Sequence, residues 1–332
     1  KIESSEQVKE IKGFGKGTLS RIDEILKTGT LKECSLYNTN SSSNINKTDN
    51  SSSGDNSKKK IKLVKPDNSN TKKRKALESV TGIGPSKARK LLENDITLEK
   101  LLDEMDSINK NLDDVSDDTS SLQELTHHQL LGIKYYHDIL ERIPRKEIVE
   151  IEKLLKKTVK KIDKDLELII CGSYRRKQET SGDIDVLVLH PKLPTKEIID
   201  KIQTKDEKFL IILVEKLTEQ KILVDHLTEN GDTKYMGICK LNSKSKGRRI
   251  DIRFIPYESK GAAMLYFTGS GNFNKKMRSE ALSKDYTINE YGIYKTVKEG
   301  KKKVKGELVK TVNEEDIFKL VGMDYLEPEN RV

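Results

Sequence analysis

The chain has 332 residues, of which 63 are Lys or Arg and 54 are Asp or Glu, so its formal charge at pH 7 is +9. Hydrophobic residues make up 34% and charged residues 35%, which predicts that part of the chain does not pack into a core. The longest apolar runs, such as Phe209–Val214, are too short to span a bilayer, and no apolar secretion signal begins the chain, so we expect neither a membrane partner nor secretion.

Residues 1–36 are predicted to form a short helical unit, followed by a disordered linker over residues 37–75. The first part of the linker, 38–57, is rich in Asn and Ser and has almost nothing to bury. The second part, 58–75, has nine basic residues and one acidic residue, so it carries +8 and leaves about +1 for everything else. This run is either a solvated linker or a nuclear-import signal. We expect a nuclear or otherwise intracellular protein.

Two glycine turns lie between predicted helices, Gly13-Phe14-Gly15 and Gly82-Ile83-Gly84. Glycine lets another backbone approach closely, and the start of the following helix offers free N–H groups to a phosphate. Each turn alone could be an ordinary connection between helices. Two in one chain favour helix-hairpin-helix binding of the DNA backbone at Gly13, Gly15, Gly82 and Gly84, and predict a DNA-binding subdomain over 76–143.

A change of pattern follows at Pro144, which is predicted to open an amphipathic helix whose apolar stripe runs from Ile148 to Ile162. Residues 166–170 and 184–189 read as buried strands, and residues 248–256 alternate as a half-exposed strand. Helices followed by a mixed sheet indicate the α+β class.

Three aspartates carry the sharpest chemical signal. Asp183 and Asp185, two residues apart at a predicted strand, present their carboxylates side by side, and Asp251 supplies a third carboxylate on a later strand. Adjacent carboxylates repel each other unless a cation lies between them, and hard oxygen ligands suit Mg²⁺. Two Mg²⁺ ions at such a site can catalyse nucleotidyl transfer.

Donors for a triphosphate lie beside this pair. Ser173, Arg176 and the backbone at Gly182 offer a hydroxyl, a guanidinium and an amide, all of which donate to phosphate oxygens. A lone DxD is weak evidence, but a Gly-Ser pair, GDxD on an apolar strand and a later aspartate together indicate a nucleotidyltransferase.

Several segments of the chain resemble the family X DNA polymerases. They are CGSYRRKQETSGDIDVLVLHP (171–191), RRIDIRFIP (248–256), LYFTGSGNFNKKMRSEAL (265–282), TINEYGI (287–293), GIGPSKARK (82–90) and HHQLLGIKYYHD (127–138). The resemblance covers nearly the whole chain except the linker. It implies a partial lyase-like helix-hairpin-helix unit (1–36), a helix-hairpin-helix DNA-binding subdomain (76–143), a nucleotidyltransferase palm (144–256) and a small nucleotide-binding subdomain (257–332).

The resemblance also implies roles for single residues. It places two Mg²⁺, with Mn²⁺ as an alternative, on Asp183, Asp185 and Asp251, and the triphosphate on Ser173, Arg176 and Gly182, with Arg142 more distant. It places the sugar and base of the nucleotide against Tyr266, Phe267, Gly269 and Asn274, and implies a cis peptide at Gly269-Ser270. Arg249 is implied to contact the primer backbone and Arg278 the template strand, and the helix-hairpin-helix turns are implied to bind a monovalent cation.

One position departs from the family. The lysine that forms a Schiff base in the family's lyase chemistry aligns with Arg21, and arginine stays protonated and cannot act as that nucleophile. No lyase nucleophile is therefore assigned, and lyase activity is not expected.

The function predicted from these features is template-directed DNA synthesis with deoxynucleoside triphosphates on primer–template or gapped DNA, as in short-gap repair, by a monomer. The first alternative is template-independent terminal transfer. The short loop from His226 to Lys234 and the pair Tyr266-Phe267 disfavour it, because terminal transferases carry a longer loop and a Gly-Trp pair there. The second alternative is a DNA-binding scaffold without catalysis, which the three aspartates disfavour.

Overall fold

The computed structural model describes residues 4–8, 16–28, 68–109, 121–202, 208–228, 231–300 and 302–331. The chain divides into two compact units, Lys1–Val64 and Lys65–Val332. The first unit contains the 3-10 helix η1 (Ser5–Val8) and the helix α1 (Lys16–Thr28). The predicted turn at Gly13 and Gly15 and the Asn/Ser-rich part of the linker lie outside the described residues.

The second unit begins with a helix where the linker was predicted to continue. The helix α3 spans Asn68–Glu78, so the linker boundary predicted at residue 75 is wrong. The reason is that Lys72, Lys73 and Lys75 occupy the exposed side of a helix whose Leu77 is fully buried. A basic run is therefore compatible with a helix when one side packs on a core.

Short helices and their connecting turns build the DNA-binding part predicted from the sequence. The helices are α3, α4 (Pro85–Glu93), α5 (Leu98–Asn109), α6 (His127–Lys134), α7 (Tyr136–Leu140) and the 3-10 helix η2 (Ser121–Glu124). Their shared core includes Leu77, Val80, Leu91, Leu101 and Ile133. Pro85 begins α4.

This helical part is joined to the following sheet by polar contacts. Asp225 of β5 (Leu223–His226) accepts hydrogen bonds from Lys134 Nζ at 2.8 Å and from Tyr135 Oη at 2.5 Å. His127 Nε2 lies 3.1 Å from the carbonyl oxygen of His226. These contacts fix α6 against one edge of the sheet.

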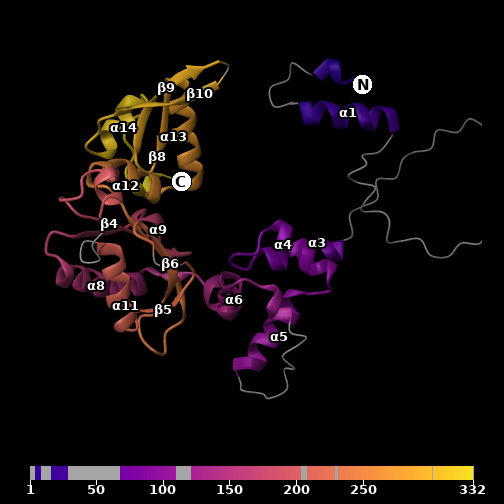
Figure 1. Cartoon of the computed structure of the whole chain (residues 1–332), viewed down its shortest axis with the longest axis horizontal. Helices are drawn as coiled ribbons and strands as arrows, with labels where there is room; N and C mark the ends of the chain where they lie inside the picture. Colours follow the sequence, from indigo (N-terminus) through magenta and orange to yellow (C-terminus); the bar gives the residue numbers. More distant parts are fainter. Residues whose placement is uncertain are drawn as a thin grey trace, which may run out of the picture. The chain divides into compact units, whose positions relative to one another are not determined.

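A five-stranded mixed sheet forms the centre of the second unit, in the order β2-β4-β7-β6-β5 (Figure 1). The other strands are β2 (Glu167–Ile170), β4 (Ile184–Leu189), β6 (Lys234–Cys239) and β7 (Arg248–Phe254), and β4 and β7 run parallel. The strands predicted at 166–170, 184–189 and 248–256 are therefore confirmed. A small ladder pairs β1 (Ile143–Pro144) with β3 (Thr180–Ser181).

The two faces of this sheet differ. The helices α8 (Arg145–Ile162) and α11 (Phe209–Glu219) pack on the face that carries Ile184, Val186 and Val188. Pro144 caps α8 and its predicted apolar stripe is buried. Because side chains alternate along a strand, Asp185 and Leu187 face the other side, where α12 (Lys260–Thr268) packs on Leu187. The short helices are α9 (Gly172–Arg175) and α10 (Lys196–Asp200).

The C-terminal part has its own core around a three-stranded sheet in the order β10-β9-β8. Its strands are β8 (Tyr286–Asn289), β9 (Gly292–Glu299) and β10 (Lys302–Val309), and its helices include α13 (Gly271–Ser283), α14 (Glu314–Leu320), η4 (Tyr257–Ser259) and η5 (Pro328–Asn330).

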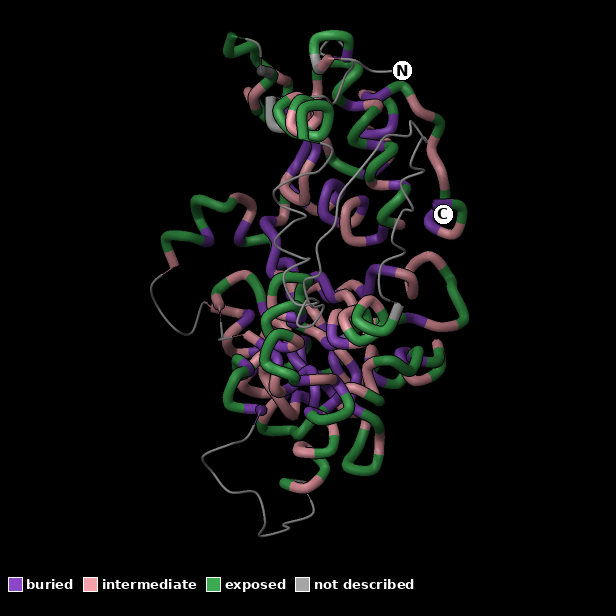
Figure 2. Tube along the Cα trace, turned by 90° about the vertical axis from the view of Figure 1, so that its right-hand side faces the viewer, coloured by how far each residue is buried: buried purple, intermediate pink, exposed green. Residues whose placement is uncertain are grey.

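The architecture confirms the predicted α+β class with a mixed sheet. Figure 2 shows that buried residues gather inside the folded parts, while many connecting segments are exposed. None of the described helices is both long and apolar enough to cross a membrane.

Candidate active site

Three aspartates meet on the face of the sheet opposite α8. Asp185 of β4 lies directly across from Asp251 of β7 in the parallel ladder, and Asp183 is the residue immediately before β4. One carboxylate oxygen of each lies within 4.8 Å of the others. The two strands thus bring together side chains that are far apart in the sequence.

The protonation of these aspartates reflects their crowding. Burial, together with the charges of Asp183 and Asp251, raises the pKa of Asp185 to about 7. Burial also raises the pKa of Asp251, although Arg249 opposes the effect. Because the negative charges of these carboxylates repel one another, a cation bound between them would stabilise the ionised cluster.

Gly172 allows Asp185 to occupy this place. Its φ is +56°, a left-handed conformation that favours glycine, and a Cβ there would lie 2.2 Å from Asp185 Oδ2. The chain turns at Gly172 from β2 into α9, so the turn that carries Ser173 packs directly against the carboxylate.

The donor set fits a hard divalent cation. Oδ1 of Asp251 is buried and has no hydrogen-bond partner among the residues that the structure describes. Such an atom costs free energy unless something coordinates it. Three carboxylates with an orphaned oxygen are the ligands that Mg²⁺ or Mn²⁺ prefers over softer metals.

Arg249 bridges two of the carboxylates. Its Nη2 donates to Asp183 Oδ2 at 3.1 Å and to Asp251 Oδ2 at 3.2 Å. The resemblance assigned it to the primer backbone; here the guanidinium instead neutralises the cluster from one side.

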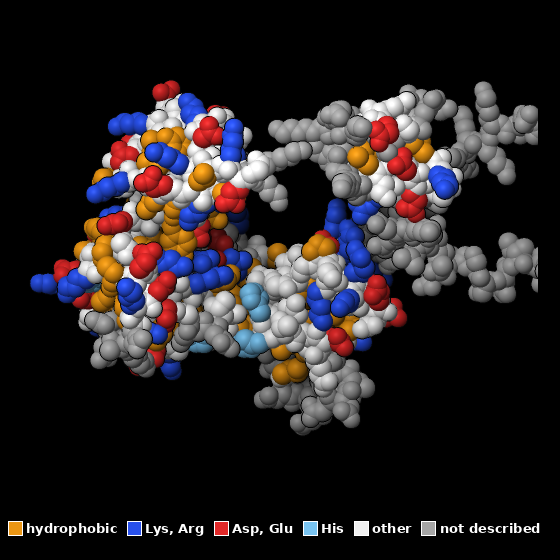
Figure 3. All heavy atoms as spheres, turned by 45° about the horizontal axis from the view of Figure 1, so that its top comes forward, with side chains coloured by type: hydrophobic (Ala, Val, Ile, Leu, Met, Phe, Trp, Pro, Cys, Tyr) orange, Lys and Arg blue, Asp and Glu red, His pale blue; other side chains and the backbone are white. Residues whose placement is uncertain are grey.

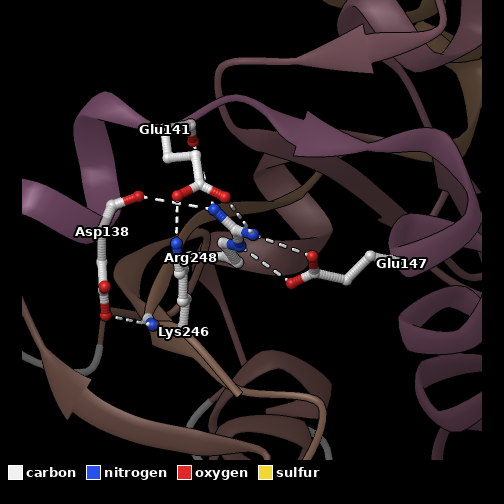
Figure 4. Close-up of polar contacts among 6 residues, drawn as sticks. Asp138, Glu141, Glu147, Lys246 and Arg248 are labelled. Atoms are coloured by element: carbon white, nitrogen blue, oxygen red, sulfur yellow. Dashed lines mark hydrogen bonds and ion pairs between the residues drawn. The ribbon is translucent and has the colours of Figure 1, made fainter.

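The start of β7, next to Arg249, is held by a buried network (Figure 4). Arg248, 4% exposed, donates to both oxygens of Glu147 at 2.8 and 2.9 Å. Its Nη1 also donates to the carbonyl oxygens of Asp138 and Glu141, and Lys246 pairs with the Glu141 carboxylate. β7 is thereby tied to α7 and α8.

The predicted triphosphate residues lie around the same turn. Ser173 is on α9, and Arg176 follows it and donates from Nη1 to the carbonyl oxygen of Thr268 at 2.5 Å. Gly182 is exposed, and a Cβ there would meet nothing within 4 Å. Arg142 donates from Nε and Nη2 to Thr180, each at 2.7 Å, and Thr180 lies two residues before Gly182 in the chain.

The residues assigned to the sugar and base occupy the end of α12 and the start of α13. Tyr266 and Phe267 are half-buried, with ring centroids 5.1 Å apart. Asn274 donates from Nδ2 to the Tyr266 carbonyl oxygen at 2.7 Å, and the Arg278 guanidinium lies 5.2 Å from the Tyr266 ring. The Gly269-Ser270 peptide is cis, as the resemblance implies.

Sequence reasoning missed the pairs that join this turn to the C-terminal part. Arg175 donates to both oxygens of Glu314, and Arg331, fully buried, donates to Glu314 Oε1 at 2.6 Å. The carbonyl oxygen of Arg331 accepts the N–H of Ser270 at 3.0 Å. No local pattern could have indicated contacts between residues 139 positions apart.

The second glycine turn lies between α3 and α4. Gly82 has a φ of +89°, and its carbonyl oxygen accepts a hydrogen bond from Gln129 Nε2 at 2.9 Å. Gly84 caps α4, and a Cβ there would meet nothing within 4 Å, so its backbone is accessible.

A second group of possible ligands, Asp163, Asp165 and His190, has another explanation. Nδ1 of the buried His190 accepts the N–H of Lys192 at 3.0 Å, so a neutral ring carries its proton on Nε2. This Nε2 faces Asp163 Oδ2 at 3.4 Å. The contact between the His190 ring and the Asp163 carboxylate accounts for this group as a structural one without a metal ion.

Comparison with known proteins agrees with this geometry. Residues 142–257 match the family model described as the DNA polymerase beta palm, and residues 263–332 match the DNA polymerase beta thumb. The chain is 36% identical over 223 residues to DNA polymerase lambda of Rattus norvegicus, covering 65% of this chain and 37% of that protein.

Two further relatives match different shares of the chain. DNA polymerase lambda of Arabidopsis thaliana is 28% identical over 343 aligned residues, covering 100% of this chain and 54% of that protein. DNA nucleotidylexotransferase of Xenopus laevis is 30% identical over 233 residues, covering 63% of this chain and 45% of that protein. The chain thus spans about half or less of the length of these curated relatives.

Proposed function

Because this chain belongs to the family X DNA polymerases, with palm and thumb of the beta type, we propose that it is a template-directed DNA polymerase. It adds deoxynucleotides to a primer 3′-hydroxyl on primer–template or gapped DNA. The observation that carries the proposal is the meeting of Asp183, Asp185 and Asp251, with the Ser173 turn packed against Asp185.

Asp183, Asp185 and Asp251 would hold two Mg²⁺, with Mn²⁺ as an alternative. Such ions, when bound, stabilise both the attacking and the leaving oxygen of a phosphoryl transfer. The protein supplies Asp185 and Asp251 from two paired strands, and burial and neighbouring negative charge raise the pKa of both, a repulsion that a bound cation would offset. Arg249, which contacts Asp183 and Asp251 through Nη2, would turn to the primer backbone if cations took its place on these carboxylates.

The rest of the nucleotide site orients the triphosphate. Ser173, Arg176 and the N–H of Gly182 donate to phosphate oxygens, with Arg142 adding positive charge nearby. Tyr266 and Phe267, at the end of α12, would lie against the sugar and disfavour a 2′-hydroxyl, while Gly269 and Asn274 would line the base side. Gly82 and Gly84 would hold a DNA phosphate backbone and a monovalent cation at their turn.

The test is single-nucleotide extension across a one-nucleotide gap with Mg²⁺, using each of the four template bases. We expect only the complementary nucleotide to be added efficiently. Asp251→Asn should raise the activation free energy of nucleotide addition by about 4 kcal/mol, which lowers the rate about a thousandfold. The affinity for DNA should be retained. Asp165→Asn, in the structural group, serves as the matched control and should extend primers normally. Undiminished synthesis by Asp251→Asn would refute the metal assignment.

A second candidate function is template-independent transfer, which the similarity to a DNA nucleotidylexotransferase favours. The connection between β5 and β6, from 227 to 233, is short, and this supports the templated reaction. Extension of a single-stranded primer at a rate similar to that on gapped DNA would favour the second candidate.

Short-gap filling in DNA repair by a nuclear monomer is the cellular role that we propose. We further propose that this role lacks 5′-lyase chemistry, because Arg21, on α1, holds the position of the family's nucleophilic lysine. Borohydride should trap little adduct on an abasic 5′ end, and Arg21→Lys should increase the adduct. Strong trapping by the unmodified chain would refute this assignment.

A further inference from the structure

The hairpin formed by β9 and β10 carries an unusual share of the positive charge. Residues 295–310 contain seven lysines and two glutamates, so this segment carries +5. Because the linker segment 58–75 carries +8, the remainder of the chain is net negative, at −4. Within the second unit, positive charge is therefore concentrated on this hairpin, on α8 (net +4) and on α3 (net +3).

Three of these lysines share one face of the hairpin. Lys303 lies directly opposite Lys298 in the antiparallel ladder, and Lys305 lies opposite Thr296. Directly opposite residues point to the same face, and so do residues two apart, which places Lys298, Lys303 and Lys305 together. All three are exposed, and Lys305 Nζ lies 3.7 Å from the Tyr294 ring centroid, on this same face.

This arrangement costs stability within the protein alone. Like charges directly opposite one another in a ladder repel. Lys303 pairs with Asp285 at 2.7 Å, but within the described part of the chain no carboxylate forms an ion pair with Lys298 or Lys305. A polyanion bound to this face would remove the remaining repulsion between its lysines.

The face continues from a proposed DNA contact. Arg278 and Leu282 lie four residues apart on one exposed side of α13, and Lys303 Nζ donates to the Leu282 carbonyl oxygen at 3.1 Å. The lysine face therefore begins about one helical turn beyond Arg278. Figure 1 shows the hairpin beside the end of α13, and Figure 3 shows Lys and Arg side chains on this part of the molecule.

We propose that the face formed by Lys298, Lys303 and Lys305 binds the phosphate backbone of the DNA strand that passes Arg278. The inference rests on the proposed function, in which that strand is the template. The hairpin extends the DNA contact beyond the catalytic site and contributes affinity without reading bases.

DNA fits this face better than an acidic protein does. The centre of a protein interface is depleted in charged residues and enriched in large apolar ones. Here charged residues stand at the centre, and the large apolar side chain on this face, Tyr294, is buried beneath Lys305. The exposed Val297 points to the opposite face of the hairpin.

The experiment measures the salt dependence of DNA affinity for the full chain and for the double variant Lys298→Gln/Lys305→Gln. Lys303 is left intact because it holds Asp285 and α13. On gapped DNA with long duplex arms, the slope of log K against log[salt] should become shallower by about 0.9 for each lysine–phosphate pair removed, so by about 2 for the double variant. On DNA trimmed to the base pairs beside the gap, the unmodified chain and the double variant should bind with the same affinity and the same salt slope.

Two controls keep the result specific. Lys298→Arg/Lys305→Arg preserves charge and should bind as the unmodified chain does, which separates charge from folding. Lys157→Gln/Lys161→Gln removes two exposed lysines of α8, on the sheet face opposite the aspartates, and should leave the slope unchanged.

Several outcomes would overturn the inference. They are an unchanged slope in the Gln double variant, an equal change in the α8 control, or a weakening that persists on trimmed DNA. Tighter binding of polyglutamate, but not of DNA, by the unmodified chain would assign the face to an acidic protein instead. Failure of the proposed polymerase function would appear separately, as absent nucleotide addition on trimmed DNA, where the hairpin makes no contact.

Discussion

Gly172 lies against the carboxylate of Asp185, and its left-handed conformation leaves no room for a side chain. The sequence marks this position only as the first residue of a Gly-Ser pair. The structure adds the reason for glycine there, which is the left-handed backbone together with the closeness of the turn to the Asp185 carboxylate. Other glycines of the same region, such as Gly271, have open space beside them.

Gly172→Ala is therefore expected to lower the rate of nucleotide addition by about a hundredfold, because moving a catalytic group by roughly 1 Å has about that cost. Gly271→Ala is the matched control, since a Cβ there meets nothing within 4 Å, and it should change the rate little. Pre-steady-state incorporation on gapped DNA measures both. Equal rates for Gly172→Ala and the unmodified chain would show that Asp185 adapts to the added methyl group.

Glu314 gives a prediction about stability. Its side chain is 6% exposed, and although burial opposes ionisation, hydrogen bonds from Arg175 and Arg331 hold its pKa below the usual value of 4.5. A depressed pKa means that the ionised network stabilises the fold above about pH 4.5 and that this contribution is lost as the pH falls through the folded-state pKa.

Glu314→Gln should accordingly lower the free energy of unfolding by about 3–5 kcal/mol at neutral pH, because it leaves buried guanidinium groups without a counter-charge. The difference from the unmodified chain should shrink in acid. Urea unfolding at a series of pH values measures it, and Glu315→Gln, on the same helix, is the control. A difference that stays constant with pH would contradict the ionic account.

At the scale of elements, the sequence predicted β2, β4, β7 and α8 of the palm, because each has a clear apolar pattern, and it did not predict β5, β6 or α11. The strand at 184–189 is an apolar run interrupted by Asp185, the strand at 248–254 alternates, and α8 has an unbroken stripe. What it could not predict is how β7 is held in place. No local pattern indicates that the charged Arg248 is buried, and it is buried because α7 and α8 surround it with acceptors from residues about 100 positions away (Figure 4).

Arg248→Gln should destabilise the palm by about 3 kcal/mol, because Glu147 is left buried without its partner. It should also slow nucleotide addition, since Asp251 lies three residues along the same strand. Lys246→Gln breaks the neighbouring exposed pair with Glu141 and should leave both properties nearly unchanged. Thermal unfolding and extension assays on the two variants test the contrast, and similar losses in both would mean that burial of Arg248 is not what matters.

At the scale of the whole molecule, local motifs indicated the chemistry and missed the long-range connections. The three aspartates and the glycine turn at Gly82 are visible in the sequence because residue type and short spacing define them. Other features depend on strand register and on packing between distant segments. They are the contact of Arg331 with Glu314, the contact of Asp225 with α6, and the shared face of Lys298 and Lys303. The sequence contains no local trace of them.

The charge distribution yields the last prediction. Since the chain outside the linker and the hairpin is net negative, non-specific attraction to DNA should depend strongly on Lys58, Lys59, Lys60 and Lys62. Replacing these four with Gln should reduce the salt slope of DNA binding by up to about 0.9 per lysine, whatever the length of the DNA arms.

The rate of nucleotide addition in the bound complex should not change, because the catalytic carboxylates and the triphosphate residues lie in the second unit. Anisotropy titrations and single-turnover extension at saturating protein separate the two effects, and Asn38, Asn40, Asn44 and Asn46 changed to Gln provide a linker control without loss of charge. A lower single-turnover rate at saturation would show that the linker acts on catalysis, whereas an unchanged slope would leave the hairpin and α3 as the main electrostatic contacts.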